Sequence, residues 1–221
     1  MPGITLRRAT PGDAPDIAAV FDAAVRTGWS YLGELVAEPM FISNDWEQLV
    51  ADQLPPNVLL VAVDDTERVL GYTAVRAEDG EMFLLFVHPA YAGRGIGRTL
   101  LAAAHDALRA AGCPEAFLFV HEQNKRALAV YTAAGYRPDG SDRVSEFRGT
   151  RLRELRLVKT ALDKRPSGIT RRRGVVSAAL PASIRRNQHQ EGSWPSSGTE
   201  RTDRLVAEGY RNVGLIAGTR A

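Results

Sequence analysis

Cysteine and long apolar stretches are both scarce in this chain. Cys113 is the single cysteine among 221 residues, which excludes an internal disulfide and argues against a metal site built from cysteine. No run of roughly 18 apolar residues occurs, so the sequence predicts no transmembrane helix. The first ten residues, MPGITLRRAT, lack the apolar core of a secretory signal peptide. We therefore expect a cytoplasmic protein that needs no metal and has no membrane partner.

Acidic and basic residues are spread unevenly along the chain, whose formal net charge is +2. Residues 1–162 contain 17 Lys and Arg against 21 Asp and Glu, a net charge of −4, whereas residues 163–221 contain 11 against 5, a net charge of +6. The change falls at a polar stretch typical of a linker. We predict one domain over residues 1–162 and a basic, low-complexity, flexible extension over residues 163–221. A solvated tail is the preferred interpretation of that extension, so no nucleic-acid partner is expected.

Apolar periodicity predicts several strands in succession, followed by strands that alternate with helices. A helix opens near residue 10, where a Thr-Pro-Gly-Asp sequence provides a start signal. The expected order, β-α-α-β-β-β-α-β-α-β-β, is typical of the mixed α+β class. The other expected elements are strands at 4–8, 58–63, 69–75, 82–87 and 116–120, two strands within 136–159, and helices at 43–54, 97–111 and 125–134.

A glycine-rich turn joins the strand at 82–87 to the helix that follows it. Gly93, Gly95 and Gly97 alternate just before the helix, where backbone N–H groups and the helix dipole form an anion site. Arg94 and Arg98 add positive charge, so a pyrophosphate would fit this turn. The sequence lacks the Gly-Lys-Ser/Thr of a Walker loop. A Rossmann fingerprint that began at Gly93 would require its third glycine at Arg98.

The run from residue 84 to residue 101, LLFVHPAYAGRGIGRTLL, resembles the pyrophosphate-binding motif of the GNAT superfamily, Arg/Gln-x-x-Gly-x-Gly/Ala. Gly95 and Gly97 match both glycines, whereas Ala92 stands where the motif has Arg or Gln. This departure removes one side chain from the turn but leaves its backbone donors.

A second segment, Asn124-x-x-Ala127-x-x-x-Tyr131-x-x-x-Gly135-Tyr136, resembles the other motif of this superfamily. Asn124 and Tyr131 are two helical turns apart and share one helix face. The resemblance covers roughly residues 3–160. It implies the GNAT fold, a central mixed but mostly antiparallel sheet flanked by helices. It also implies an acetyl-CoA-dependent N-acetyltransferase that transfers the acetyl group directly to a primary amine of a small molecule or protein. A non-catalytic acyl-CoA-binding regulatory module is the alternative.

The resemblance also implies roles for individual residues. Tyr131, beside the CoA sulfur, would protonate the leaving thiolate, and Glu81, fourteen residues before Gly95, would be the general base. Glu122, acting through a water, is the alternative base. Asn124 would bond the pantetheine arm, and the strand amides would polarise the thioester. The expected acetyl-CoA contacts are Leu85, Phe86, Val87, Arg94, Gly95, Ile96, Gly97, Arg98, Thr99 and Asn124.

The amine acceptor is not identified by the sequence, and monomer and homodimer both remain open. The superfamily builds its acceptor pocket from the segment between the first strands, here residues 29–46. The acidic residues of that segment would favour a cationic amine, and its aromatic residues are interpreted as core or wall. His88, His121 and Cys113 are interpreted as structural, because the histidines lack metal-site spacing. The residues considered in the segment are Trp29, Tyr31, Trp46, Glu34, Glu38 and Asp45.

Overall fold

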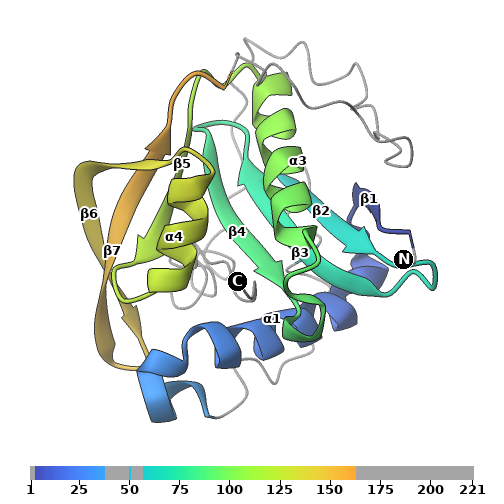
Figure 1. Cartoon of the computed structure of the whole chain (residues 1–221), viewed down its shortest axis with the longest axis horizontal. Coiled ribbons are helices and arrows are strands. Elements are labelled where there is room, and N and C mark those ends of the chain that lie inside the picture. Colours follow the sequence, from blue (N-terminus) through green and yellow to red (C-terminus); the bar gives the residue numbers. More distant parts are fainter. Residues whose placement is uncertain (1–2, 38–49, 51–56, 163–221) are drawn as a thin grey trace, which may run out of the picture.

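The computed structural model describes residues 3–37, 50 and 57–162, which form one sheet with helices on both faces (Figure 1). The mixed α+β class is confirmed. The helix predicted at 43–54 lies outside the described residues, except for Val50, which is buried. The strands are β1 (Thr5–Arg8), β2 (Val58–Val63), β3 (Val69–Arg76), β4 (Glu81–Val87), β5 (Ala116–His121), β6 (Arg137–Phe147) and β7 (Thr150–Lys159); the helices are α1 (Ala14–Gly28), α3 (Ile96–Ala110) and α4 (Lys125–Ala133), with 3-10 turns η1 (Pro11–Asp13), η2 (Ser30–Val36) and η3 (Pro89–Tyr91).

The sheet has the strand order β1-β2-β3-β4-β5-β7-β6. Every neighbouring pair is antiparallel except β4 and β5, which are parallel, so the prediction of a mixed but mostly antiparallel sheet is confirmed. The predicted meander corresponds to β2, β3 and β4. A parallel neighbour requires a crossover connection, and α3 provides it between β4 and β5.

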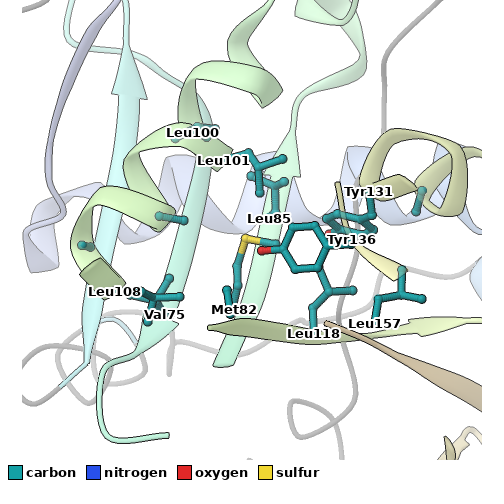
Figure 2. Packing of buried hydrophobic residues seen from close by; sticks show 14 of the residues in the cluster. Val75, Met82, Leu85, Leu100, Leu101, Leu108, Leu118, Tyr131, Tyr136 and Leu157 are labelled. Carbon is teal, nitrogen blue, oxygen red and sulfur yellow. The ribbon is translucent and has the colours of Figure 1, made fainter. Parts of the chain in front are cut away.

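The two faces of the sheet are covered by two separate apolar clusters. On one face, α1 and η2 pack on strands β2 to β4, and Phe21 of α1 meets Phe86 of β4 edge-to-face with ring centroids 5.0 Å apart. On the other face, α3 and α4 cover the middle of the sheet, where Leu85, Tyr131 and Tyr136 lie in one cluster (Figure 2). We call these faces the α1 face and the α3/α4 face.

Strand β4 carries an irregularity that its uniform apolar sequence conceals. The register with β3 passes from Leu84 opposite Ala74 to Met82 opposite Val75, so Phe83 is an extra residue. Phe83 and Leu84 consequently both pack in the α1 cluster, whereas Met82 packs in the α3/α4 cluster. A bulge of this kind bends a strand and increases its twist.

The described part of the chain ends at Leu162, which is buried and whose N–H donates to the carbonyl of Pro114 at 3.1 Å. Residues 163–221 lie outside the described residues, so the domain boundary at residue 162 and the flexible extension stay predictions. No helix in the described ranges is long and apolar enough to span a bilayer.

Gly71 of β3 provides a test of how closely the central strands and α3 pack. A Cβ atom at this position would lie 2.7 Å from the Phe86 carbonyl oxygen and 3.2 Å from Leu100 Cδ1. We expect Gly71→Ala to lower the free energy of unfolding by about 1–3 kcal/mol through overpacking. The matched control is Gly12→Ala, whose Cβ would only meet Thr10 Oγ1 at 3.8 Å. Equal melting temperatures for the two variants would contradict this packing.

Candidate functional site

Strands β4 and β5 pair at a single position and then separate. Glu81 stands opposite Phe117, and the Phe117 N–H donates to the Gly80 carbonyl at 3.1 Å. Beyond this point the register contains no further β4–β5 pair among the described residues. Each strand is held on its other side, β4 by β3 and β5 by β7. The separation therefore leaves a split within a continuous sheet.

The β4 backbone on the edge of this split has hydrogen-bonding groups that the sheet does not use. The His88 N–H donates to the Leu70 carbonyl at 2.9 Å, so residue 88 is directed toward β3. Antiparallel pairing alternates along the strand, which directs the N–H of Phe86 to β3 and those of Leu85 and Val87 toward β5. Of the three predicted backbone contacts, Leu85 and Val87 thus have amides that face the split.

Helix α4, which follows β5, has two buried polar residues, Asn124 at its N-cap and Tyr131 in its last turn. The Asn124 side-chain oxygen accepts from the Ala127 N–H at 3.0 Å and caps the helix. The Asn124 side-chain nitrogen and the Tyr131 hydroxyl are buried without a hydrogen-bond partner among the described residues. Tyr131 is 0% exposed, and burial raises its pKa well above the ordinary value. The phenol is therefore protonated at neutral pH.

The glycine-rich turn brings unused backbone donors to the start of α3. Gly95 adopts φ = 85°, which favours glycine, and its carbonyl accepts the N–H of Thr99 at 3.0 Å. Since this is the first bond within the helix, the N–H groups of residues 96–98 have no partner inside it. Arg94 and Arg98 are exposed beside the turn, and no acidic residue occupies the first helical turn. This arrangement is suited to a bound anion.

The two predicted base candidates differ in their surroundings. Glu81 is buried and forms an ion pair with Arg76. Burial raises the pKa of the Glu81 carboxyl, although the positive charges of Arg76 and Arg143 oppose this. The Glu122 side chain is 44% exposed and pairs with Arg153 at 3.0 Å. Glu81 alternates with Met82 and therefore lies on the α1 face, opposite the face where Tyr131 packs.

Residues that are far apart in the sequence meet on the α1 face. The Tyr31 hydroxyl lies 2.8 Å from His121 Nδ1, and the Trp29 ring packs against His121 with centroids 4.7 Å apart. Glu154 is fully buried and contacts the same histidine. Glu154 is the site residue that sequence reasoning missed; its place in the apolar alternation of β7 is the one signal that could have revealed it. Glu38, Asp45 and Trp46 lie outside the described residues.

The remaining polar candidates have local partners. His88 Nδ1 accepts from the Ala90 N–H at 3.2 Å, which caps η3. The Cys113 thiol lies 3.4 Å from the Ala77 carbonyl, and burial raises its pKa. Glu34 is exposed. Across residues 3–37 and 57–162 no group of three or more His, Cys, Asp or Glu side chains could hold a metal ion.

Known proteins resemble the chain in both sequence and structure. It is 35% identical over 149 residues to the mycothiol acetyltransferase of Clavibacter michiganensis subsp. michiganensis, a match that covers 63% of this chain and 44% of that protein. It is 29% identical over 144 residues to the peptidyl-lysine N-acetyltransferase YjaB of Salmonella typhimurium, a match that covers 65% of this chain and 90% of YjaB. A GCN5-related N-acetyltransferase from Rhodopseudomonas palustris has a similar structure, with a TM-score of 0.59 and 24% sequence identity. The match covers 72% of this chain and 97% of that protein.

The chain spans about half the length of the mycothiol acetyltransferases that it matches. The family model described as the acetyltransferase (GNAT) family matches residues 25–136, about half of the chain. That segment includes the β4–β5 split, the turn before α3, and the two buried polar residues Asn124 and Tyr131. The chain belongs to the acetyltransferase (GNAT) family.

Proposed function

We propose that the protein transfers the acetyl group of acetyl-CoA directly to a primary amine. The observation that carries this proposal is a pair of buried polar atoms at the split that have no hydrogen-bond partner among the described residues, the Asn124 side-chain nitrogen and the Tyr131 hydroxyl. An unsatisfied buried polar group costs about 1–3 kcal/mol, so such groups usually have a partner that binds. A ligand lying between β4 and α4 would supply one for each.

The shape and chemistry of acetyl-CoA match the groups along this path. Its pantetheine arm carries amides, which would pair with the β4 backbone at Leu85 and Val87 and with Asn124. Its pyrophosphate would accept the N–H groups of residues 96–98 and attract the exposed Arg94 and Arg98. The remaining predicted contacts lie in the same two places. Phe86 is on β4, and the others are in the glycine-rich turn and the first turn of α3: Gly95, Ile96, Gly97 and Thr99.

Acetyl-CoA supplies an activated acyl group, and the residues around it supply positioning and proton transfer. A β4 amide directed at the thioester oxygen would stabilise the developing negative charge, a contribution of about 3 kcal/mol for one such donor. The amine lone pair forms the C–N bond, and the electrons of the C–S bond leave with sulfur. Tyr131 then donates its proton to the thiolate. Its buried phenol is protonated at neutral pH, as this role requires.

A base must take the proton that the amine loses. Glu81 fits this role through its burial and raised pKa, which make its carboxylate a stronger base than one in water. Glu122 is a weaker candidate because it is exposed and paired with Arg153. The acceptor class remains a primary amine of a small molecule or a protein, and the name of the relative YjaB, a peptidyl-lysine N-acetyltransferase, is compatible with a lysine. We propose a cytoplasmic location for this reaction.

A non-catalytic acyl-CoA-binding module is the second candidate, because Ala92 occupies the place of a conserved-motif Arg or Gln in the turn. Both functions require the same binding site, and only transfer releases free CoA. The two candidates are therefore separated by measuring product rather than binding.

Acetyl-CoA mixed with a panel of amines should release CoA thiol in an acceptor-dependent manner. The panel would contain a lysine peptide, a peptide with a free N-terminus, a polyamine, an amino acid and an aminoglycoside. Thiol release would be read with a chromogenic disulfide and the acetylated product identified by mass spectrometry. Tight binding of acetyl-CoA with no acceptor-dependent release from any amine would favour the binding module.

Tyr131→Phe should lower kcat by about 10²–10⁴-fold while acetyl-CoA affinity changes little, because only the proton donor is lost. The defect should shrink at high pH, where the thiolate needs less help to leave. Tyr136→Phe is the matched control: its ring lies 5.7 Å from that of Tyr131 and its hydroxyl lies 2.8 Å from His105 Nε2. This control should cost stability and leave kcat close to wild type. A Tyr131→Phe enzyme with full kcat at every pH would show that water or another residue supplies the proton.

A further inference from the structure

A buried polar network lies at the end of β5 on the α1 face, and the mechanism above does not use it. His121 is 3% exposed and has a partner at each ring nitrogen. Its Nδ1 lies 2.8 Å from the Tyr31 hydroxyl of η2, and its Nε2 lies 3.2 Å from a carboxylate oxygen of Glu154 on β7. The second contact is within ion-pair distance but is not an aligned hydrogen bond.

These two contacts determine how the imidazole is used. A carboxylate only accepts hydrogen bonds, so its charge favours the proton on Nε2. Nδ1 then presents a lone pair to the Tyr31 hydroxyl, which donates to it. The order of proton donation therefore runs from Tyr31 to His121, and an imidazolium formed there would face the negative charge of Glu154. This is the orientation that a proton-accepting histidine needs.

Glu154 is itself held in place by a second contact. It is 0% exposed, and its other oxygen accepts from Arg143 Nε at 2.6 Å. The Arg143 guanidinium lies over the Phe119 ring, 3.7 Å from its centroid. The titratable and charged groups that face His121 are thus Tyr31 from η2, Glu154 from β7 and, through Glu154, Arg143 from β6. Trp29, whose ring also packs against His121, does not titrate.

The register of the sheet places His121 at the level of the split. Glu81 and Phe117 are paired in parallel, and the bulge at Phe83 adds one residue to β4. His121, four residues beyond Phe117, therefore stands across the split at the level of Leu85 and Phe86. Val120 packs in the α3/α4 cluster, which directs the neighbouring His121 to the opposite face. An acyl group held at Leu85 would have Tyr131 on one face of the sheet and the Tyr31–His121 pair on the other.

We infer that Tyr31, His121 and Glu154 form the path along which the acceptor amine loses its proton; this inference rests on the proposed acetyl transfer. The bound ammonium gives a proton to the Tyr31 oxygen while the Tyr31 proton passes to His121 Nδ1, and the amine lone pair that this frees then forms the C–N bond. The second proton that the nitrogen loses as the amide forms balances the one that Tyr131 gives to the thiolate. Glu154 stabilises the resulting imidazolium, which returns its proton to solvent by the reverse route after the products leave. Tyr31 is the half-buried end of the path and the group placed to touch the amine. His121 and Glu154 act through it.

Glu81 is less free to serve as the base than its position in the motif implies. Its carboxylate is paired with Arg76, its neighbour across the β3–β4 hairpin. Accepting a proton there would weaken that ion pair, whereas a proton on His121 creates one with Glu154. The contacts of the network on the α1 face are therefore arranged for His121 to accept a proton from Tyr31.

The test measures how fast an amine substrate of the wild-type enzyme is acetylated by two variants, Tyr31→Phe and His121→Gln, with wild type and Glu81→Gln measured alongside. Both variants should lose about 10²-fold or more in kcat at neutral pH while keeping acetyl-CoA binding. The loss should shrink as the pH rises toward the amine pKa, near 10.4 for a lysine-like amine, and with a weakly basic amine that arrives neutral. Tyr72→Phe is the matched control, because it removes from the same face a buried hydroxyl that has no partner in the described part of the chain. Thermal unfolding of each variant monitors folding.

Each outcome of this comparison decides the question. A Tyr31→Phe enzyme with wild-type kcat across the pH range overturns the inference, and so does a loss that is equal at every pH and for every amine. If instead Glu81→Gln alone reproduces the pH-dependent loss, Glu81 is the base. A wild-type enzyme that acetylates no amine overturns the proposed function, and the path then has no reaction to serve.

Discussion

The separation of β4 from β5 is the constraint on which the rest of the structure depends. Buried backbone N–H and C=O groups are almost always paired, so a sheet that opens in its interior must compensate its unpaired edge. Two features of the chain maintain the opening. Each strand is paired on its far side, and the extra residue Phe83 bends β4 next to the last shared position. A ligand with its own amides would complete the edge, as an added strand does.

The opening also explains why the two faces of the sheet carry different chemistry. On the α3/α4 face, apolar side chains surround the Tyr131 hydroxyl, which has no partner within the described ranges, and exposed Arg94 and Arg98 lie at the start of α3. On the α1 face, buried Glu81 and Glu154 are each paired with an arginine. The proposed proton donor, Tyr131, and the proposed proton acceptor would thereby be kept apart by the thickness of the sheet. An acyl group in the split would be accessible to both without allowing them to neutralise each other.

Local patterns made much of the fold and half of the site predictable. Alternation or short apolar runs predicted the described strands, and fixed spacings within one turn or helix identified the glycines before α3 and the pair Asn124 and Tyr131. These patterns can be recognised from sequence because the residues of each motif are separated by no more than about two helical turns. The Arg76–Glu81 ion pair could also have been anticipated, since the two residues flank a short hairpin loop.

The features that were not predicted fall into two groups. Some depend on contacts between residues far apart in the sequence, and one lies in a strand whose uniformly apolar sequence contains no pattern. Tyr31 and His121 are 90 residues apart, and nothing in either local sequence indicates the other. Glu154 reads as one more residue of a long charged strand until the sheet places it between β5 and β6. The bulge at Phe83 is invisible because β4 is buried on both faces, so a two-residue period is absent from its sequence.

Amide hydrogen exchange along β4, measured with and without saturating acetyl-CoA, tests the central claim most directly. The Leu85 and Val87 amides, which face the split, should exchange slowly only when acetyl-CoA is bound. The Phe86 amide, directed to β3, should be protected in both states and provides an internal reference. If acetyl-CoA leaves the exchange of Leu85 and Val87 unchanged, the ligand does not occupy the split, and the account of this site is wrong.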